Sequence, residues 1–454
     1  MATITTRTGV ELEDQSTAAG RTGVMQRDVG TSSGSDRRST RGGANEDDPV
    51  LEASRLADAT VPEGGYGWVA IAGCAVITWC HSGFCRVAAN GSHTSALAIV
   101  NARIVRWLGI RRTGLLGVSL LGLGEIVSGS AVHSLAGLFV TAGIVMGLGI
   151  SLCFTTVSVT PAQYFSRRRG LANDIVFAGG GLGGAATTYL LQVLVQKHGP
   201  AWAYRIVGFL TLATGLPAAW VVKERTPIRT TGFVDWRLFR DPKFLLIFLT
   251  GVIATFPLLV PPFFLPLYSR SIGLSSSTGA ALLAGYNFAS AVGRILCGFF
   301  CDRLGPVNTL FCALLLTALS MLALWPASTT LGSLAVFVVI NGAANGGYFA
   351  TMPTVVGNVF GSQRVAVAMG MVVTGWVGGY LMIRILGTVC FSSSLTLFQG
   401  APIAGYLLQA YGGADSGLKA FRPAMFYAGS LSLGAAISVA LMRLYISRSP
   451  FRKL

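Results

Sequence analysis

The chain has 454 residues, of which 52% are hydrophobic and 11% are charged, and it carries a formal net charge of +16. Its 58 glycines exceed the level of about 7% that is usual in soluble proteins. This composition excludes an ordinary soluble domain and indicates a membrane protein. No Ser/His/Asp triad, carboxylate pair or cluster of metal ligands gathers in one loop, so we expect no enzyme activity, no metal and no cofactor.

The first 62 residues differ from the rest of the chain. They are rich in Ser, Thr, Gly, Asp and Arg and hold few aromatic side chains. A segment of this composition cannot bury enough apolar surface to offset the entropy of ordering it. We therefore expect residues 1–62 to form a disordered cytosolic tail. It is not a signal peptide, because no apolar region follows its first positive residues.

Apolar runs recur from Tyr66 nearly to the end of the chain. A transmembrane helix needs about 20 apolar residues to cross about 30 Å of hydrocarbon. Runs of this kind cover residues 66–84, 115–132, 135–159, 171–195, 201–222, 244–268, 279–300, 307–326, 331–352, 365–383 and 424–444. A weaker candidate surrounds residues 95–100. The expected fold class is therefore an all-α polytopic membrane protein.

The positive charge is concentrated in alternate connections between these runs. Lys and Arg cluster in residues 7–55, 103–112, 167–169, 223–243 and 443–453, and they are sparse in the other connections. This is the positive-inside pattern, which places both termini and the basic loops in the cytosol and requires an even number of spans. The location of the charge argues against a nucleic-acid partner and for the lipid bilayer as the partner.

An internal repeat relates "YFSRRRGLANDIVFAGGGLGG" to "VFGSQRVAVAMGMVVTGWVGG". Counted from Phe165 and Phe360, both stretches have arginine four residues later and glycine at the same three later offsets. Parallel repeats of six helices are typical of secondary carriers, whose substrate site lies between the halves near the midplane. We expect one half over residues 63–222, a cytosolic loop over 223–243, a second half over 244–446 and a cytosolic tail over 447–454.

Three phrases carry a family resemblance. The phrase "EGGYGW" resembles the signature that opens the first helix of the monocarboxylate transporter family, within the major facilitator superfamily; it contains Glu63, Gly64, Gly65, Gly67 and Trp68. "YFSRRRGLANDIVFAGG" resembles that family's second signature, and "GRILCGFFCDRLG" resembles its eighth helix and the loop that follows. "GLFVTAGIVMGLG" and "GAPIAGYLL" resemble fungal members. The resemblance implies a major facilitator fold of two six-helix bundles.

The signature phrase predicts how the first helix begins. We expect Glu63 and the glycines to form a cytosolic approach to that helix, where a carboxylate favours the positive end of the helix dipole. Tyr66 and Trp68 are expected at the level of the lipid headgroups. Substrate contact by this phrase is the alternative.

Two segments depart from the family pattern. Between residues 84 and 103 the chain has too few apolar residues for a full second helix, so we expect a truncated one. Residues 381–399 form an atypical insertion before the "GAPIAGYLL" phrase. A defective carrier that results from a flawed gene model is consequently one alternative.

Intramembrane polar residues indicate where substrate could bind. Arg294 lies within an expected span, and its planar fork suits a carboxylate. The resemblance implies an arginine at this place with an aspartate four residues earlier, where this chain has Ser290. A structural arginine is the alternative. Further candidates for the cavity wall are the amides Asn287, Asn341 and Asn345, although "NGAANGGY" also fits close packing of helices through small residues.

Glu125 is the only carboxylate that the pattern of apolar runs places in the middle of an expected span. A buried carboxyl can bind and release a proton, so Glu125 is our candidate for proton coupling. A hydrogen bond to a neighbouring helix is the alternative role.

Charged residues near the span ends are candidates for gating. The resemblance implies that Asp302 and Arg303, with Gly305, hold a cytosolic gate in one of two arrangements, whereas an ordinary solvated turn is the alternative. The cluster of Arg167, Arg168 and Arg169 belongs either to that gate or to the topology signal. Asn90 begins the sole glycosylation sequon, which we expect to lie outside, close to the membrane and unoccupied.

The combined expectation is a multi-pass carrier of the plasma membrane that moves a small organic molecule by alternating access. The resemblance implies a monocarboxylate or related anion as substrate, with a proton as candidate coupling ion. The alternative within transport is an exporter or importer of a larger fungal metabolite. A substrate-sensing receptor is a rival class, for which a long folded cytosolic domain would be expected.

Overall fold

The computed structural model describes residue 61 and residues 63–82, 98–225, 236–361, 364–376, 402–413 and 417–446. The expected tail before residue 61, Asn90, the insertion at 381–399 and the tail at 447–454 lie outside the described residues. So does the middle of the loop expected at 223–243. These expectations therefore stay predictions.

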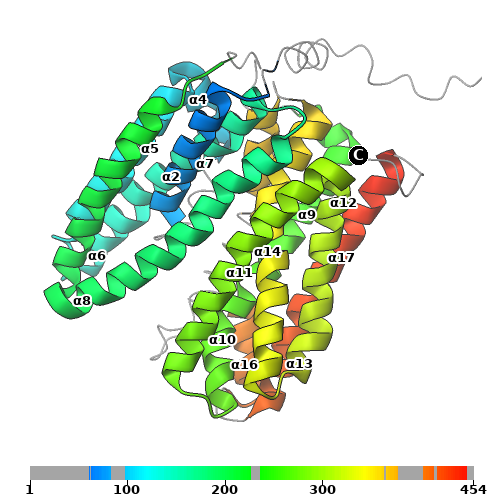
Figure 1. The fold of residues 1–454 in the computed structure, drawn as a ribbon. Helices are drawn as coiled ribbons and strands as arrows, with labels where there is room; N and C mark the ends of the chain where they lie inside the picture. The colour runs from blue at the N-terminus through cyan, green and yellow to red at the C-terminus, as the bar shows by residue number, and fades with distance from the viewer. Residues whose placement is uncertain are drawn as a thin grey trace, which may run out of the picture. The chain divides into compact units, whose positions relative to one another are not determined.

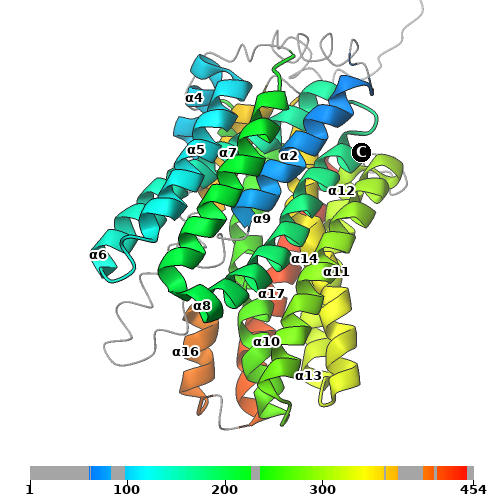
Figure 2. The ribbon, with the colours of Figure 1, turned by 60° about the vertical axis from the view of Figure 1, so that its left-hand side comes forward.

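The described part of the first half is helical (Figures 1 and 2). They are α2 (Tyr66–Ser82), α4 (Ala98–Leu108), α5 (Ile110–Ser128), α6 (Leu135–Leu138), a π-helical stretch (Phe139–Val145), α7 (Met146–Tyr164) and α8 (Arg169–Val221). α8 contains two rods, because Gly199 has φ 77°, outside the helical region, and Pro200 then starts the second rod. The two spans expected at 171–195 and 201–222 match these rods.

The second half begins at a capped helix start, where the Asp241 side chain accepts a hydrogen bond from the N–H of Lys243. The described residues of this half form α9 (Pro242–Leu258), α10 (Val260–Ser271), α11 (Ser276–Leu304), α12 (Pro306–Leu319), a π-helical stretch (Ser320–Leu324), α13 (Trp325–Ala327), α14 (Leu331–Phe360), a helix at Val365–Trp376, α16 (Pro402–Ala410) and α17 (Arg422–Ile446). Thr330 and Ser333 form a capping box at the start of α14. The described residues of both halves contain no strand.

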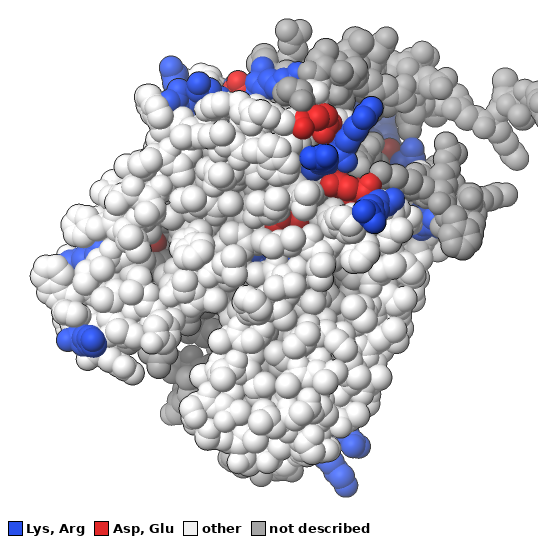
Figure 3. Space-filling model, in the orientation of Figure 1, with Lys and Arg blue, Asp and Glu red and all other residues white. Residues whose placement is uncertain are grey.

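Helix length and surface charge agree with a membrane protein. Within the described ranges, seven helices are long and apolar enough to cross a membrane, and shorter apolar helices cover Tyr66–Cys80 and Val365–Trp376. On the face in Figure 3, charged side chains gather mostly toward the end that carries α4, next to a broad uncharged zone. The expected all-α polytopic class is confirmed.

Three apolar segments refine the expectation. The run expected at 244–268 lies within one apolar span, Pro242–Ser271, in which Leu259 separates α9 from α10 and Pro257 and Pro261 flank it. The weak candidate at 95–100 corresponds to α4, which begins at Ala98 and has 11 residues. The residues "PIAGYLL" lie in α16, which was absent from the expected spans.

The halves pack on each other along α8, which contacts both α11 and α14. Small residues make this approach possible. A Cβ atom on Gly181 of α8 would lie 2.9 Å from the Cβ of Ala291 on α11, and one on Gly170 would lie 2.6 Å from the Cβ of Cys301. The polar groups on this line of contact are therefore the natural candidates for a functional site.

Candidate functional site

The two signature phrases, far apart in sequence, meet at the start of α8. The Glu63 carboxylate accepts hydrogen bonds from the backbone N–H groups of Ser166 and Arg167, at 2.7 and 2.6 Å. These N–H groups belong to the turn between α7 and α8. Turn N–H groups need an acceptor, and the Glu63 carboxylate supplies it. A favourable interaction of Glu63 with the dipole of its own helix stays a prediction.

Aromatic contacts hold the same two phrases together. The Trp68 ring packs on the Phe165 ring with centroids 4.8 Å apart. A Cβ atom on Gly67 would lie 3.1 Å from the Phe165 ring, so the missing side chain lets α2 approach the end of α7. The Tyr66 hydroxyl donates to the carbonyl of Val221 at 2.6 Å. The phrase "EGGYGW" therefore anchors the start of α2 to its neighbours.

Asp302, at the end of α11, caps the start of α8 in the other half. Its carboxylate accepts from the N–H groups of Gly170 and Leu171 at 2.9 and 3.0 Å. The first N–H groups of a helix have no acceptor within the helix and carry partial positive charge, so a carboxylate is favoured there.

Arg169 makes the reciprocal contact from α8 to the end of α14. Its side chain is buried, and its Nη1 donates to the carbonyl of Gly357 at 3.0 Å and to the Asn358 side chain at 3.2 Å. The last carbonyls of a helix favour a cation in the same way. Nearby, the Asn173 amide donates to the Thr354 hydroxyl at 2.9 Å. We call Asp302, Arg169 and their backbone partners the inter-half latch.

The other predicted gating residues have local surroundings. The Arg303 guanidinium lies over the Phe299 ring of its own helix, 4.1 Å from the centroid. Gly305 has φ 95° and joins α11 to α12, a backbone conformation that suits glycine. The side chains of Arg167 and Arg168 are exposed. Gating by these four residues stays a prediction.

Arg294 lies on the line of contact between the halves. It is half-buried, and its Nη1 donates to the carbonyl of Phe177 on α8. One turn further on, a Cβ atom on Gly298 would lie 2.7 Å from the Cβ of Asp174. Arg294 therefore lies between α11 and α8, where a bound molecule or a change in the packing of these two helices would alter its contacts. Substrate contact by Arg294 stays a prediction.

The predicted amides join a buried network within the second half. The Tyr286 hydroxyl donates to the Asn341 side chain at 3.3 Å, and the Asn341 amide donates to Ser320 at 2.7 Å. The Asn345 amide donates to the Leu258 carbonyl at 2.9 Å and to the Tyr286 hydroxyl. The amides of Asn341 and Asn345 hold helices together here, and a place on the wall of a substrate cavity stays a prediction. Asn287 is likewise buried.

Glu125 is enclosed within the first half. It is fully buried on α5, and a Cβ atom on Gly208 of α8 would lie 3.0 Å from its Cβ. Thr211 and Tyr204 of α8 face the carboxyl. This placement separates Glu125 from the latch, so a role in proton coupling stays a prediction.

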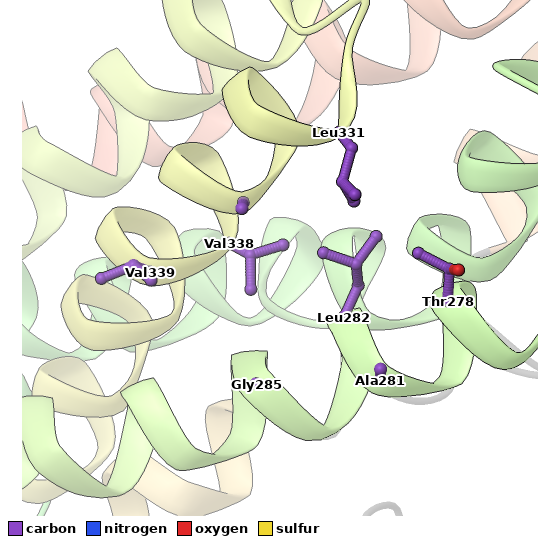
Figure 4. A pocket seen from close by; sticks show the side chains of 8 residues that line it. Thr278, Ala281, Leu282, Gly285, Leu331, Val338 and Val339 are labelled. Atoms are coloured by element: carbon purple, nitrogen blue, oxygen red, sulfur yellow. The ribbon is translucent and has the colours of Figure 1, made fainter. Parts of the chain in front are cut away.

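A small pocket lies between the first parts of α11 and α14, with a volume of about 260 Å³ (Figure 4). Its wall is almost wholly apolar and contains none of the predicted site residues; it is formed by Thr278, Ala281, Leu282, Gly285, Leu331, Ala335, Val338 and Val339. Such a wall suits an apolar group.

A family model described as Major Facilitator Superfamily matches residues 87–376 and 258–453 of the chain. The chain belongs to the Major Facilitator Superfamily. It is thus a multi-pass membrane protein of a transporter family.

Similar proteins of this superfamily come from fungi. The chain is 27% identical over 409 residues to the "Aspyridones efflux protein apdF" of Emericella nidulans, covering 80% of this chain and 82% of the other. It is 28% identical over 298 residues to the "Agnestins efflux protein AgnL12" of Paecilomyces divaricatus, covering 65% of this chain and 64% of the other. The finer resemblance to monocarboxylate transporters remains a prediction.

Solved structures show the same fold. The superfamily transporter FucP in its outward conformation matches with a TM-score of 0.64 at 12% identity, covering 83% of this chain and 99% of that one. An outward-facing bacterial homologue of the iron transporter ferroportin gives 0.61 at 12% identity, covering 83% and 99%. The expected two-bundle fold of this superfamily member is thereby confirmed.

Sequence reasoning missed functional candidates in this superfamily chain. Asp174 is a fully buried carboxyl at the contact of α8 with α11, and Tyr286 links two of the predicted amides. Asp174 lies at the start of the expected span at 171–195, so a rule that asks for a carboxylate in the middle of a span does not select it. Its place close to the arginine cluster at 167–169 is the reason that it was treated as part of a span end.

Proposed function

We propose that this chain is a secondary-active carrier of the plasma membrane that exports an organic metabolite by alternating access. The observation that carries the proposal is the inter-half latch. The second half supplies Asp302 of α11 to the start of α8, and the first half supplies Arg169 of α8 to the end of α14. Rocking of two repeats around a central site is how such carriers expose the site to one side and then the other.

The latch supplies one of the two states that this mechanism needs. Hydrogen bonds to ionised groups contribute about 1.5–3 kcal/mol each, so a few of them hold an interface that can still open. When the halves separate at this end, water replaces the side chains as partner of the helix ends. With both termini in the cytosol, as the basic loops predict, the latched end faces the cytosol.

The similar proteins support the direction of transport and the substrate class. Two of them are named as efflux proteins for aspyridones and agnestins. Export of an organic metabolite also suits the apolar pocket between α11 and α14, whose wall offers contact to hydrocarbon but only Thr278 as a hydroxyl.

Transport of a monocarboxylate or related anion is the second candidate. It is favoured by Arg294, a cation on the line of contact between the halves. Its guanidinium fork suits a carboxylate group on either a small anion or a larger metabolite.

Flux measurements in both directions test the proposal. Cells that express the chain are loaded with a panel of labelled carboxylates and neutral metabolites, and outward and inward fluxes are compared with those of cells that express Asp302→Ala at equal surface amounts. We expect outward flux of at least one class, reduced about tenfold or more in the variant, because two charge-assisted hydrogen bonds of the latch are lost. Inward flux alone would overturn export, and no flux above empty cells would overturn the carrier.

A further inference from the structure

The carboxyl group of Asp174, in the first half, is covered by a helix of the second half. It lies near the start of α8, is fully buried, and neither of its oxygens has a hydrogen-bond partner among the described residues. The covering helix is α11, since a Cβ atom on Gly298 would lie only 2.7 Å from the Asp174 Cβ. Separation of α8 and α11 would therefore be the event that gives this carboxyl water.

The charged groups around Asp174 leave its negative charge unbalanced. From α11, Asp302 and Arg294 face it, together with the thiols of Cys297 and Cys301. The charges of Asp302 and Arg294 offset each other. Arg169, on the same helix as Asp174, donates instead to the end of α14. A proton is the ligand that restores neutrality at a buried carboxyl in such surroundings.

The neighbouring polar groups are already engaged. Both oxygens of Asp302 accept N–H groups of α8, and Arg294 Nη1 donates to the carbonyl of Phe177, one turn after Asp174. On the α14 side, the adjacent Asn173 donates to Thr354. These fixed contacts hold the two helices together around the carboxyl while the latch is closed.

We propose that Asp174 is a proton-binding site that is loaded when the two halves are latched and emptied when they separate. Asp174 then hydrates in its ionised form, beside Arg294. If the latched state holds one more proton than the separated state, the equilibrium between them changes by up to about tenfold per pH unit. Falling pH therefore favours the latched state, and rising pH favours the separated state.

For a carrier, this site couples one proton to the opening of the latched end. The proton leaves toward the compartment that this end faces when it opens, which is the compartment from which an exported substrate enters. This coupling rests on the proposed function, and it makes the exchange of a proton for a substrate the expected mode. The pH dependence of the latch itself requires no knowledge of the substrate.

The experiment measures the latch rather than transport. Spin labels on non-natural residues at Trp107 and Leu304 leave the native cysteines in place; both positions are exposed, one in each half, and neither belongs to the latch. The distance between the labels is followed in the full chain, in lipid nanodiscs, from pH 5 to pH 8. We expect a short distance at low pH and a growing longer population as pH rises.

Substitutions assign this response to Asp174. Asp174→Asn keeps the shape of the side chain without its titration, so the distance distribution should stay latched at every pH. Arg294→Gln removes the cation that favours ionised Asp174, so the transition should move to higher pH; this variant keeps the test decisive if Asp174→Asn fails to reach the membrane. Asp241→Asn, at the start of α9, is the matched control and should respond as the parent does.

The proposal is overturned by a parent that shows no pH response, or by an Asp174→Asn variant that responds as the parent does. A response abolished by Glu125→Gln but kept by Asp174→Asn would place the proton site within the first half and overturn it also. Intact pH dependence of the distance without any substrate flux would support the proton site and contradict the carrier function. Flux without pH dependence would do the reverse.

Discussion

Asp302 and Arg169 illustrate how single residues act across the interface on the ends of helices in the other half. Each is matched to a helix end of suitable polarity, the carboxylate to the start of α8 and the guanidinium to the end of α14. Arg294 differs, because it donates to the carbonyl of Phe177, which lies within α8 rather than at its end. That carbonyl already accepts a hydrogen bond inside the helix. An engaged helix carbonyl is a weaker partner, so a stronger acceptor such as a carboxylate would compete with it for the Arg294 guanidinium.

Arg294→Gln tests that competition. Loss of one side of a charge-assisted pair typically weakens binding by about 2–5 kcal/mol, so we expect anionic-substrate transport to fall at least tenfold. Arg294→Lys keeps the charge but loses the fork, and it should retain a fraction of the activity. The measurement is flux of labelled carboxylates and neutral metabolites at equal surface amounts. Parent-like flux of the native substrate in the glutamine variant would show that Arg294 is not the anion site.

Glu63→Ala tests the anchoring of the first helix. The substitution leaves the N–H groups of Ser166 and Arg167 without their acceptor, and we expect a loss of about 1–3 kcal/mol in the free energy of unfolding. Thermal unfolding in detergent measures the loss. A parent-like melting temperature would contradict the anchoring role.

At the scale of the helices, the contact of α8 with α11 depends on residues without side chains. A Cβ atom on Gly298 would meet the Asp174 Cβ at 2.7 Å and the Leu171 Cα at 2.9 Å. A backbone atom cannot move aside as the end of a flexible side chain does. An added methyl group would therefore move the two helices apart instead of changing a rotamer. Glycine here therefore sets how closely the latched state can pack.

Gly298→Ala should shift the halves apart. Overpacking typically costs about 1–3 kcal/mol, and we expect most of it to fall on the latched state, which raises the separated population at neutral pH. Gly285→Ala on the same helix is the matched control, since its Cβ would find Val338 at 3.9 Å, an ordinary contact. The distance between labels at Trp107 and Leu304 reports the shift. An equal response of both variants would refute the argument.

The elements show what a sequence alone can predict here. The helices were predictable because the hydrocarbon thickness demands long apolar runs, and the repeat predicted two halves. The break at Leu259 was not predictable from apolarity, because it depends on how flanking prolines disturb backbone hydrogen bonding. Nor was the approach of Asp174 to Gly298. That contact depends on the register of two helices from different halves, which no local pattern encodes.

At the scale of the whole molecule, topology decides which compartment the latched end faces. The fold, confirmed by superfamily membership, leaves the orientation to the basic loops. Lys197 lies beside Gly199, between the two rods of α8, and its side chain is exposed. It is therefore a suitable reporter position for the side opposite to the latch.

Reporter tags at Met1, Lys197 and Leu454 test the orientation. Because positive loops remain in the cytosol, we expect the first and last tags to be protected from external protease in intact cells and the tag at Lys197 to be cleaved. Permeabilised cells, in which all three tags should be cleaved, are the control. A cleaved tag at Leu454 in intact cells would contradict the even number of spans and favour an additional span near residues 381–399.

The latch has a consequence for how sequences of this kind can diverge. Asp302 accepts hydrogen bonds from main-chain N–H groups of α8, and Arg169 donates to a main-chain carbonyl of α14. Every substitution except proline leaves these main-chain groups in place. Mutation at residues 170, 171 or 357 thus alters fit but leaves half of each contact chemically intact. A change at Asp302 or Arg169 removes its hydrogen bonds to these main-chain groups, and no substitution at residues 170, 171 or 357 can restore them.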